Sequence, residues 1–412
     1  MMNASASQVS NDTGQENNEV KVISFDGGPS PMVTLRILYK IEQWYADKNE
    51  GRSFIKTANM FAGTSDGALI SLFMANALKK DKDLSGLKLL EQCIEFNDKL
   101  VRMFKLDDTA RMRLLLGKES IFEREVLEDI LKDAFEDTLM EDLVGSDWPV
   151  LVGAFDATAW EMTTFHSDNW RVDGNMKLVD VGLAASAFPI MLPPFKSPDH
   201  PQLKNHLILD GVLASNSMIP ATIRGVGLRF ASNPQGDSAE ANRSSNASDR
   251  IKLLSIGSTS TRFPNENDKD ISTLKIILFL LPYLHRLFKF NLDINNQADS
   301  TPRSPKTGWR AWFENLFSVL NAIIEGGSQL DDGVATHTLG PKRYFRFKPE
   351  VPNFRLVLLS LADPEKALLA AENCADEFFN KSNEEYENSK QGPDSTQREH
   401  AELLRWIEEN WK

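Results

Sequence analysis

The amino-acid sequence predicts an α/β protein with a central, mainly parallel β-sheet flanked by helices. Two strand–turn–helix units carry this prediction. In the first, the β-branched run 19–25 leads into Asp26-Gly27-Gly28, and residues 33–41 follow with the apolar spacing of a helix. In the second, Gly63-Thr64-Ser65-Asp66-Gly67 leads into the mostly apolar run 68–75, which is typical of a helix buried against a sheet. Two such units close together indicate βαβ crossings, which build parallel sheets.

The elements that follow alternate between charged helices and short apolar strands. In chain order the sequence predicts helices within 84–143, a buried strand at 148–156, its partner strand at 161–165, a short helix of small residues at 179–187, and core strands at 206–211 and 251–258. The short helix ends before Pro189, because proline lacks the N–H group that a helix interior requires.

Composition and charge exclude some classes of function. The chain has 412 residues, of which 41% are hydrophobic and 25% charged, an ordinary globular composition that suffices for one large or two modest domains. The net charge of −13 argues against nucleic-acid binding, because counterion release requires a basic surface. The two cysteines, Cys93 and Cys374, fall in predicted helices and form no disulfide framework. We therefore expect a reducing, cytoplasmic location.

The two ends of the chain differ from its middle. Residues 1–18 are rich in Asn, Ser and Gln and lack the basic start and apolar stretch of a signal peptide, so we expect a disordered tail. Residues 19–380 are expected to form one domain. Residues 381–412 are predicted as a polar linker followed by an amphipathic helix that docks on the body of the protein.

Ser65 is the first candidate for chemistry, because it is the centre of a G-x-S-x-G motif, residues 63–67. Such a serine lies on a sharp turn between a strand and a helix, where neighbouring residues must lack a Cβ atom. The turn raises the hydroxyl out of the sheet, and the N–H groups that open the helix can donate to an anion. Glycines also flank serines in ordinary loops, which is the alternative interpretation.

A serine hydroxyl needs a base to become a nucleophile. The six histidines are His166, His200, His206, His285, His337 and His400. None follows a strand end with a flanking glycine, and His337 is the best of them because it comes late in the chain. Asp210 is a stronger candidate, since it ends a short apolar strand and precedes Gly211, at the sheet edge where catalytic groups gather. An ordinary Asp-Gly turn is the alternative.

Several blocks in order resemble the patatin-like phospholipases, a family of lipid acyl hydrolases with a Ser-Asp dyad. The blocks are Asp26-Gly27-Gly28, the motif at 63–67, the small-residue helix and proline turn at 185–189 with Pro193-Pro194, and residues 210–216. Residues 253–258 are similar to the next strand of the family. The resemblance extends over residues 20–258, more weakly to 370, and implies a three-layer fold with the sheet between helices.

The resemblance also implies a reaction. Ser65 would attack an ester carbonyl while Asp210 takes its proton, and water would then release the fatty acid from an acyl-enzyme. The backbone N–H groups of Gly27, Gly28 and Asp66 would form the oxyanion hole. The implied substrate is a phospholipid or another acyl lipid, bound in an apolar cleft, and no metal or other cofactor is required. Contact with the periphery of a membrane and the oligomeric state stay open.

Two departures from the family pattern keep other functions open. Pro29-Ser30-Pro31 stands where the family loop continues with a glycine, a basic residue and a glycine, and Arg36 lies too far along the next helix to be a sure substitute. Proline has no N–H to donate, and loss of an oxyanion donor costs roughly 10²–10³ in rate. Val212 replaces a second glycine after the aspartate. The alternatives are a patatin-fold lipid- or partner-binding protein with weak or no hydrolysis, an acyltransferase, and a histidine-dependent esterase.

The segment 271–325 is a candidate cap or lid. Residues 274–284 are strongly apolar, and aromatic side chains recur on one helical face over 309–320. A membrane span is disfavoured, because the first run is short and broken by Pro282. Two interpretations stay open, namely packed core helices, or a cap that covers the site and touches lipid.

Overall fold

We analysed a computed structural model of the chain. It describes residues 19–28, 31–116, 118, 120–169, 175–189, 191–196, 203–232, 247–257, 327–349, 353–389 and 401–411. The predicted tail, 1–18, and the cap candidate, 271–325, lie outside the described residues.

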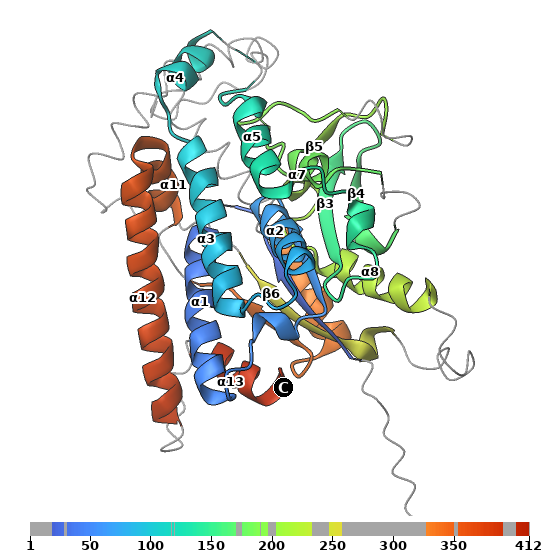
Figure 1. The fold of residues 1–412 in the computed structure, drawn as a ribbon, viewed down its shortest axis with the longest axis vertical. Helices are drawn as coiled ribbons and strands as arrows, with labels where there is room; N and C mark the ends of the chain where they lie inside the picture. Colours follow the sequence, from blue (N-terminus) through green and yellow to red (C-terminus); the bar gives the residue numbers. More distant parts are fainter. Residues whose placement is uncertain are drawn as a thin grey trace, which may run out of the picture.

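One mainly parallel sheet forms the centre of the molecule (Figure 1). Its strands are β1 (Val20–Phe25), β2 (Met60–Thr64), β3 (Val150–Asp156), β4 (Glu161–His166), β5 (Ile208–Asp210), β6 (Ile251–Ile256) and β7 (Tyr344–Phe347). The order is β4-β3-β2-β1-β6-β7, with β5 paired to β3. The adjacent strands in the series β3-β2-β1-β6-β7 are parallel to one another, whereas β4 and β5 run antiparallel to β3. This topology confirms the predicted α/β class.

Helices connect the strands and cover both faces of the sheet. The α-helices are α1 (Pro31–Lys48), α2 (Asp66–Lys80), α3 (Gly86–Met103), α4 (Asp108–Leu115), α5 (Arg124–Phe135), α7 (Leu178–Ala185), α8 (Ile219–Ser232), α11 (Asn353–Ala362), α12 (Pro364–Ser389) and α13 (Glu402–Asn410). Residues 327–339 are also helical. Short 3₁₀ helices are η1 (Ile55–Thr57), η2 (Met140–Leu143), η3 (Ser167–Asn169), η4 (Gly211–Leu213) and η6 (Ala247–Arg250).

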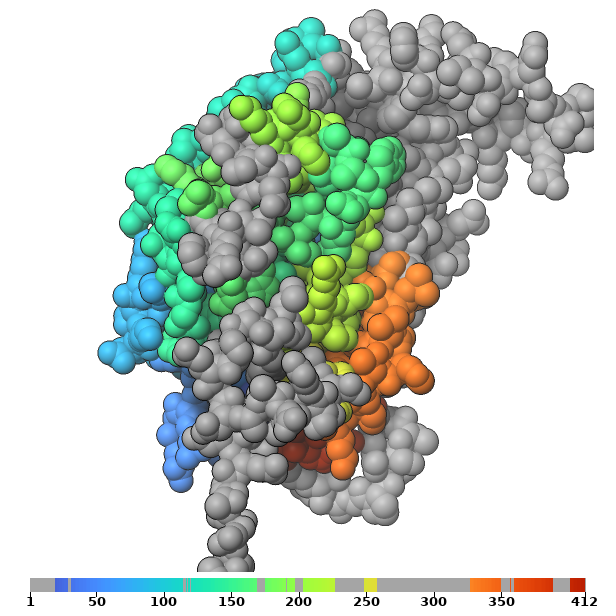
Figure 2. Space-filling model, turned by 90° about the vertical axis from the view of Figure 1, so that its right-hand side faces the viewer, coloured from blue at the N-terminus to red at the C-terminus, as the bar shows by residue number. Residues whose placement is uncertain are grey.

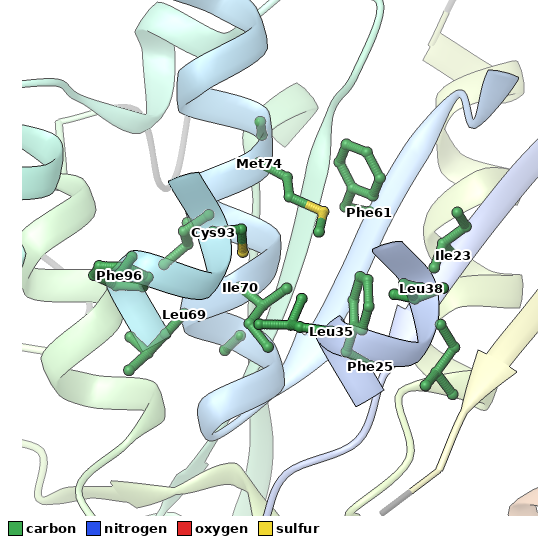
Figure 3. Close-up of a cluster of buried hydrophobic side chains, with 14 of the residues drawn as sticks. Ile23, Phe25, Leu35, Leu38, Phe61, Leu69, Ile70, Met74, Cys93 and Phe96 are labelled. Atoms are coloured by element: carbon green, nitrogen blue, oxygen red, sulfur yellow. The ribbon is translucent and has the colours of Figure 1, made fainter. Parts of the chain in front are cut away.

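The strands alternate their side chains between two cores, as the period of two requires. On one face, Ile23 and Phe61 share a cluster with Leu35 of α1 and with Met74 of α2, which lies beside Phe61 (Figure 3). Helices α3 and α12 pack in turn on α1, away from the sheet (Figure 1). The molecule therefore has helices, then the sheet, then helices.

The second core covers the opposite face of the sheet. It joins Val22 of β1 and Leu253 of β6 to Ile219 of α8 and Ala335 of helix 327–339. Figure 2 views this side, where the orange segment that contains helix 327–339 lies beside the yellow-green segment that contains α8. Because β1 and β6 are buried on both faces, four of the six residues in each strand are apolar.

The C-terminal region packs against the body of the protein. Residues 381–389, part of the predicted linker, form the last turns of α12, and 390–400 lie outside the described residues. Helix α13 buries Leu403, Leu404 and Ile407, as its amphipathic pattern predicts. In the part of the chain that the structure describes, no helix is both long and apolar enough to cross a lipid bilayer.

Candidate active site

Ser65 occupies the sharp turn between β2 and α2. Its backbone angles, φ 55° and ψ −125°, lie outside the regions that a side chain tolerates easily. The flanking glycines make this turn feasible. A Cβ atom on Gly63 would lie 2.1 Å from the carbonyl oxygen of Gly67, and one on Gly67 would lie 2.3 Å from that of Phe25. The glycines of the motif are therefore a steric requirement of the turn.

The register of the sheet brings Asp210 to Ser65. Both β2 and β5 pair with β3. The last residue of β2, Thr64, lies opposite Gly153, and the last residue of β5, Asp210, lies opposite the next residue of β3, Ala154. The Ser65 hydroxyl donates a 2.6 Å hydrogen bond to Asp210 Oδ2, across 145 residues of sequence.

The turn after Asp210 holds the other carboxylate oxygen. The Val212 N–H donates to Asp210 Oδ1 over 2.9 Å. A Cβ atom on Gly211 would lie 2.5 Å from the carbonyl oxygen of Gly153, so only glycine fits there. Val212 is not among the described residues with positive φ, so it replaces the family's second glycine without backbone strain.

Burial controls the protonation of two carboxyl groups in the site. The side chain of Asp210 is fully buried, and this burial raises its pKa to about 7. Hydrogen bonds from Ser65 and from the Val212 N–H oppose the rise, while the neighbouring Asp66 carboxyl adds to it. Burial also raises the pKa of Asp66 to about 7. A carboxyl with a pKa near neutrality can accept a proton and give it back.

The glycine loop after β1 lies against the serine. A Cβ atom on Gly27 would lie 2.6 Å from Ser65 Cβ and 2.9 Å from Asn216 Oδ1, so a side chain is excluded there. Gly28 has φ 109°, which favours glycine. Within the described residues, the N–H groups of Gly27 and Gly28 have no acceptor. Pro29 and Ser30 lie outside the described residues.

Asp66 provides the third predicted oxyanion donor. It is the first residue of α2, and the first N–H groups of a helix have no acceptor within that helix. The site thus combines a hydroxyl, a carboxylate and amide groups that can receive negative charge. These are the groups that acyl transfer through a serine requires.

The loop residue Asp26 has a partner that the sequence did not reveal. Arg346 of β7 forms an ion pair with Asp26, with 2.5 Å between Nη2 and Oδ2. Burial lowers the pKa of the Arg346 guanidinium, but the Asp26 carboxylate outweighs this effect and holds the pKa above its usual value. The contact spans 320 residues, and β7 has no motif of its own. Only the pairing of β7 with β6 could have indicated it.

Of the described histidines, two have hydrogen-bond partners other than Ser65 and the third is exposed. His166 accepts a 3.0 Å hydrogen bond from the Asp168 N–H, and His206 pairs with Asp156. His337 is exposed on helix 327–339. His200, His285 and His400 lie outside the described residues.

Arg36 does not take the place of the basic residue that is absent from the glycine loop of this chain. Its guanidinium bonds to Asp98 at 3.0 Å and to the carbonyl oxygen of Met32 at 2.7 Å.

Two other features of the described residues bear on where a site lies. The lining of one hollow of about 260 Å³ includes Phe73, Asn76 and Lys80 of α2, Gln92 of α3 and Ala134 of α5, whereas Ser65 directly precedes the first residue of α2. Among the described residues, no group of three or more His, Cys, Asp or Glu side chains is arranged to hold a metal ion.

Comparison with known proteins finds similarity to the same family that the motifs resemble. The model of the patatin-like phospholipase family matches residues 34–223, which confirms the resemblance drawn from the sequence. The match includes Ser65 and Asp210, begins after the glycine loop and ends before Arg346. Patatin-like protein 4 of Arabidopsis thaliana is 23% identical over 205 residues, a stretch that covers 48% of this chain and 50% of that protein. The match thus spans about half the length of this curated relative.

Among solved structures, the crystal structure of VipD from Legionella pneumophila aligns over 95% of this chain and 79% of that chain. The TM-score is 0.29 and the sequence identity 11%. A TM-score this low supports no argument, and the fold stands on the sheet described above.

Proposed function

We propose that this chain, whose residues 34–223 match the patatin-like phospholipases, hydrolyses fatty acyl esters of lipids. The observation that carries the proposal is the 2.6 Å hydrogen bond from the Ser65 hydroxyl to Asp210. The family match supports a lipid acyl hydrolase in general terms. The dyad, the oxyanion hole and the substrate are our inferences for this chain.

In the proposed first half-reaction, Ser65 Oγ attacks the ester carbonyl carbon while its proton passes to Asp210. The carbonyl oxygen becomes an oxyanion, which the N–H groups of Gly27, Gly28 and Asp66 stabilise. When the intermediate collapses, the ester C–O bond breaks and Asp210 returns the proton to the leaving alcohol. An acyl-serine results.

In the second half-reaction, a water molecule takes the place of the alcohol. Asp210 accepts a proton from this water as its oxygen attacks the acyl-serine. Collapse of the second intermediate then releases the fatty acid and restores the Ser65 hydroxyl. One carboxylate serves as base and acid in turn, which its pKa of about 7 favours. We propose a phospholipid or another acyl lipid as the substrate.

Substitution of the two residues tests this reaction. We expect Ser65→Ala and Asp210→Asn each to abolish hydrolysis of a short-chain ester, because groups that act as a unit lose activity together. His337→Ala is the matched control, since this side chain is exposed on helix 327–339, and it should retain full activity. Activity in Ser65→Ala, or an inactive His337→Ala beside an active Asp210→Asn, would contradict the dyad.

A second candidate function is lipid or partner binding without turnover, which Pro29 in the oxyanion loop favours. Covalent labelling with a fluorophosphonate distinguishes the two, because only an activated serine reacts. A labelled Ser65 together with release of free fatty acid from lipid supports the hydrolase. Transfer of the acyl group to an alcohol acceptor would identify an acyltransferase. Absence of label would support the binding function.

A further inference from the structure

We propose that Arg346, which lies outside the region matched by the family, is a positioning residue for the oxyanion loop. It holds Asp26, and Asp26 sets the place of Gly27 and Gly28 beside Ser65. This inference rests on the proposed hydrolase function and names a residue that the reaction depends on without touching the substrate.

The first step is the contact between Arg346 and Asp26. The Arg346 side chain is 10% exposed and that of Asp26 is 0% exposed. Nη2 lies 2.5 Å from Oδ2, and Nη1 donates a 2.7 Å hydrogen bond to Ser255 Oγ on β6. The guanidinium is thereby fixed by two elements, and a fork-shaped donor of this kind sets the direction of a carboxylate as well as its distance.

The backbone of Asp26 connects the ion pair to the turn that carries Ser65. The Asp26 N–H donates to the carbonyl oxygen of Ile256 over 2.9 Å. A Cβ atom on Gly67 would lie 2.7 Å from the Asp26 carbonyl oxygen, so the Asp26 backbone lies directly on the start of α2. Gly27, the next residue, excludes a side chain because Ser65 is in contact with it. A shift of Asp26 must therefore move the loop relative to the nucleophile.

The buried carboxylate of Asp26 also needs a positive charge beside it. Removing one partner of a buried ion pair leaves an uncompensated charge, which a protein relieves by protonation or by rearrangement. The first basic residue after the loop in sequence is Arg36, and it is engaged by Asp98. The Asp331 carboxyl interacts with both Asp26 and Arg346 and adds negative charge nearby. Arg346 therefore supplies the cation that compensates the buried Asp26 carboxylate at the start of the loop.

Kinetics of a soluble ester test the inference. We expect Arg346→Met to lower kcat by about 10- to 100-fold while KM changes less than about twofold, since loss of a whole oxyanion donor costs roughly 10²–10³-fold. Arg346→Lys keeps the charge without the fork, and it should fall between Met and wild type. Arg343→Met is the matched control. Arg343 lies just before β7 and forms an exposed 3.0 Å ion pair with Asp249, and its loss should leave kcat unchanged.

A double variant separates positioning from plain stability. Asp26→Asn with Arg346→Met replaces a buried ion pair by a neutral pair, which is better tolerated than one unpaired charge. We expect it to regain the thermal stability lost in Arg346→Met but not the lost kcat. A double variant with wild-type kcat would overturn the inference, as would an Arg346→Met variant that is fully active.

Hydrogen exchange gives a measure that does not depend on activity. Amide exchange of the peptide containing Gly27 and Gly28 should be faster in Arg346→Met than in wild type and in Arg343→Met. Exchange that is unchanged there would overturn the inference. If the wild-type protein fails to hydrolyse any ester, the proposed function fails, and exchange still decides whether Arg346 holds the loop.

Discussion

At the scale of single residues, two carboxyl groups that titrate near neutrality distinguish this site. Asp210 and Asp66 both have a pKa raised to about 7 by burial. The Asp66 charge contributes to the rise at Asp210. The two groups therefore titrate as a pair, and the pH dependence of the reaction should report on both.

In the proposed reaction Asp210 must be ionised to accept a proton, so hydrolysis should increase with pH through about pH 7. In Asp66→Asn the like charge is removed while the backbone N–H is kept. The pKa of Asp210 should then fall, and the rising limb of kcat/KM should move to lower pH. Profiles from about pH 5 to about pH 9 with a soluble ester decide this. If the rising limb of kcat/KM lies at the same pH in Asp66→Asn and in the wild-type protein, the two carboxyl groups do not interact.

The same pKa predicts a stability cost for Asp210. Its folded pKa of about 7 exceeds the reference value of 3.8, so the native state binds the proton more tightly than the unfolded chain. The native state is thus destabilised as pH rises from about 4 to about 7.

Asp210→Asn carries no charge and keeps the size of the side chain. At pH 8 it should raise the free energy of unfolding by a few kcal/mol at most, taking about 1.36 kcal/mol per pKa unit. The gain should vanish near pH 4. Urea unfolding at both pH values measures it, and equal gains at the two pH values would refute an origin in burial of the charge.

At the scale of elements, the turn from β2 into α2 depends on backbone contacts that leave no room for side chains. Gly67 lies against the Phe25 carbonyl, so the helix begins in contact with the end of β1. The helix carries ten buried residues, and its placement fixes one of the two cores. This crossing therefore links the turn that carries Ser65 to the packing of the sheet.

Alanine at Gly67 would place a Cβ atom 2.3 Å from a backbone oxygen. We expect Gly67→Ala to cost about 1–3 kcal/mol or more, the typical range for overpacking, and to abolish hydrolysis. Gly333→Ala is the control, since nothing lies within 4 Å of that Cβ position. In a helix it should gain up to about 1 kcal/mol. Thermal unfolding checks both, and equal effects would contradict the steric account.

At the scale of the whole molecule, residues near the C-terminus pack against the rest of the protein beside β1. Trp411 is fully buried, its indole N–H donates to Thr57 Oγ1 over 2.8 Å, and its ring lies 5.5 Å from that of Phe54. Its carbonyl oxygen accepts a 3.2 Å hydrogen bond from Lys21 Nζ. Segments 390 residues apart in sequence thus depend on each other.

Trp411→Ala should reduce the free energy of unfolding by about 3–5 kcal/mol, the usual cost of emptying a buried aromatic position. Trp160, which is 80% exposed, is the control, and Trp160→Ala should change stability by about 0.5 kcal/mol or less. Chemical denaturation measures both. Similar small losses for both variants would mean that the C-terminal helix contributes little to the fold.

The sequence alone determined the fold class, most of the strands and the candidate nucleophile and base. These signals are local: a glycine turn, an apolar run or a strand-end aspartate is encoded by adjacent residues whose sterics and polarity act over a few positions. The catalytic roles of Ser65 and Asp210 are still predictions.

Only the tertiary structure decided which of these residues meet. Strand register on β3 brings Asp210 to Ser65, and the parallel pairing of β7 with β6 carries Arg346 to Asp26. Strand pairing depends on hydrogen bonds and packing between segments far apart in the chain. No local pattern records these contacts, so the hydrogen bond at the site and the ion pair behind its loop emerge only from the folded sheet.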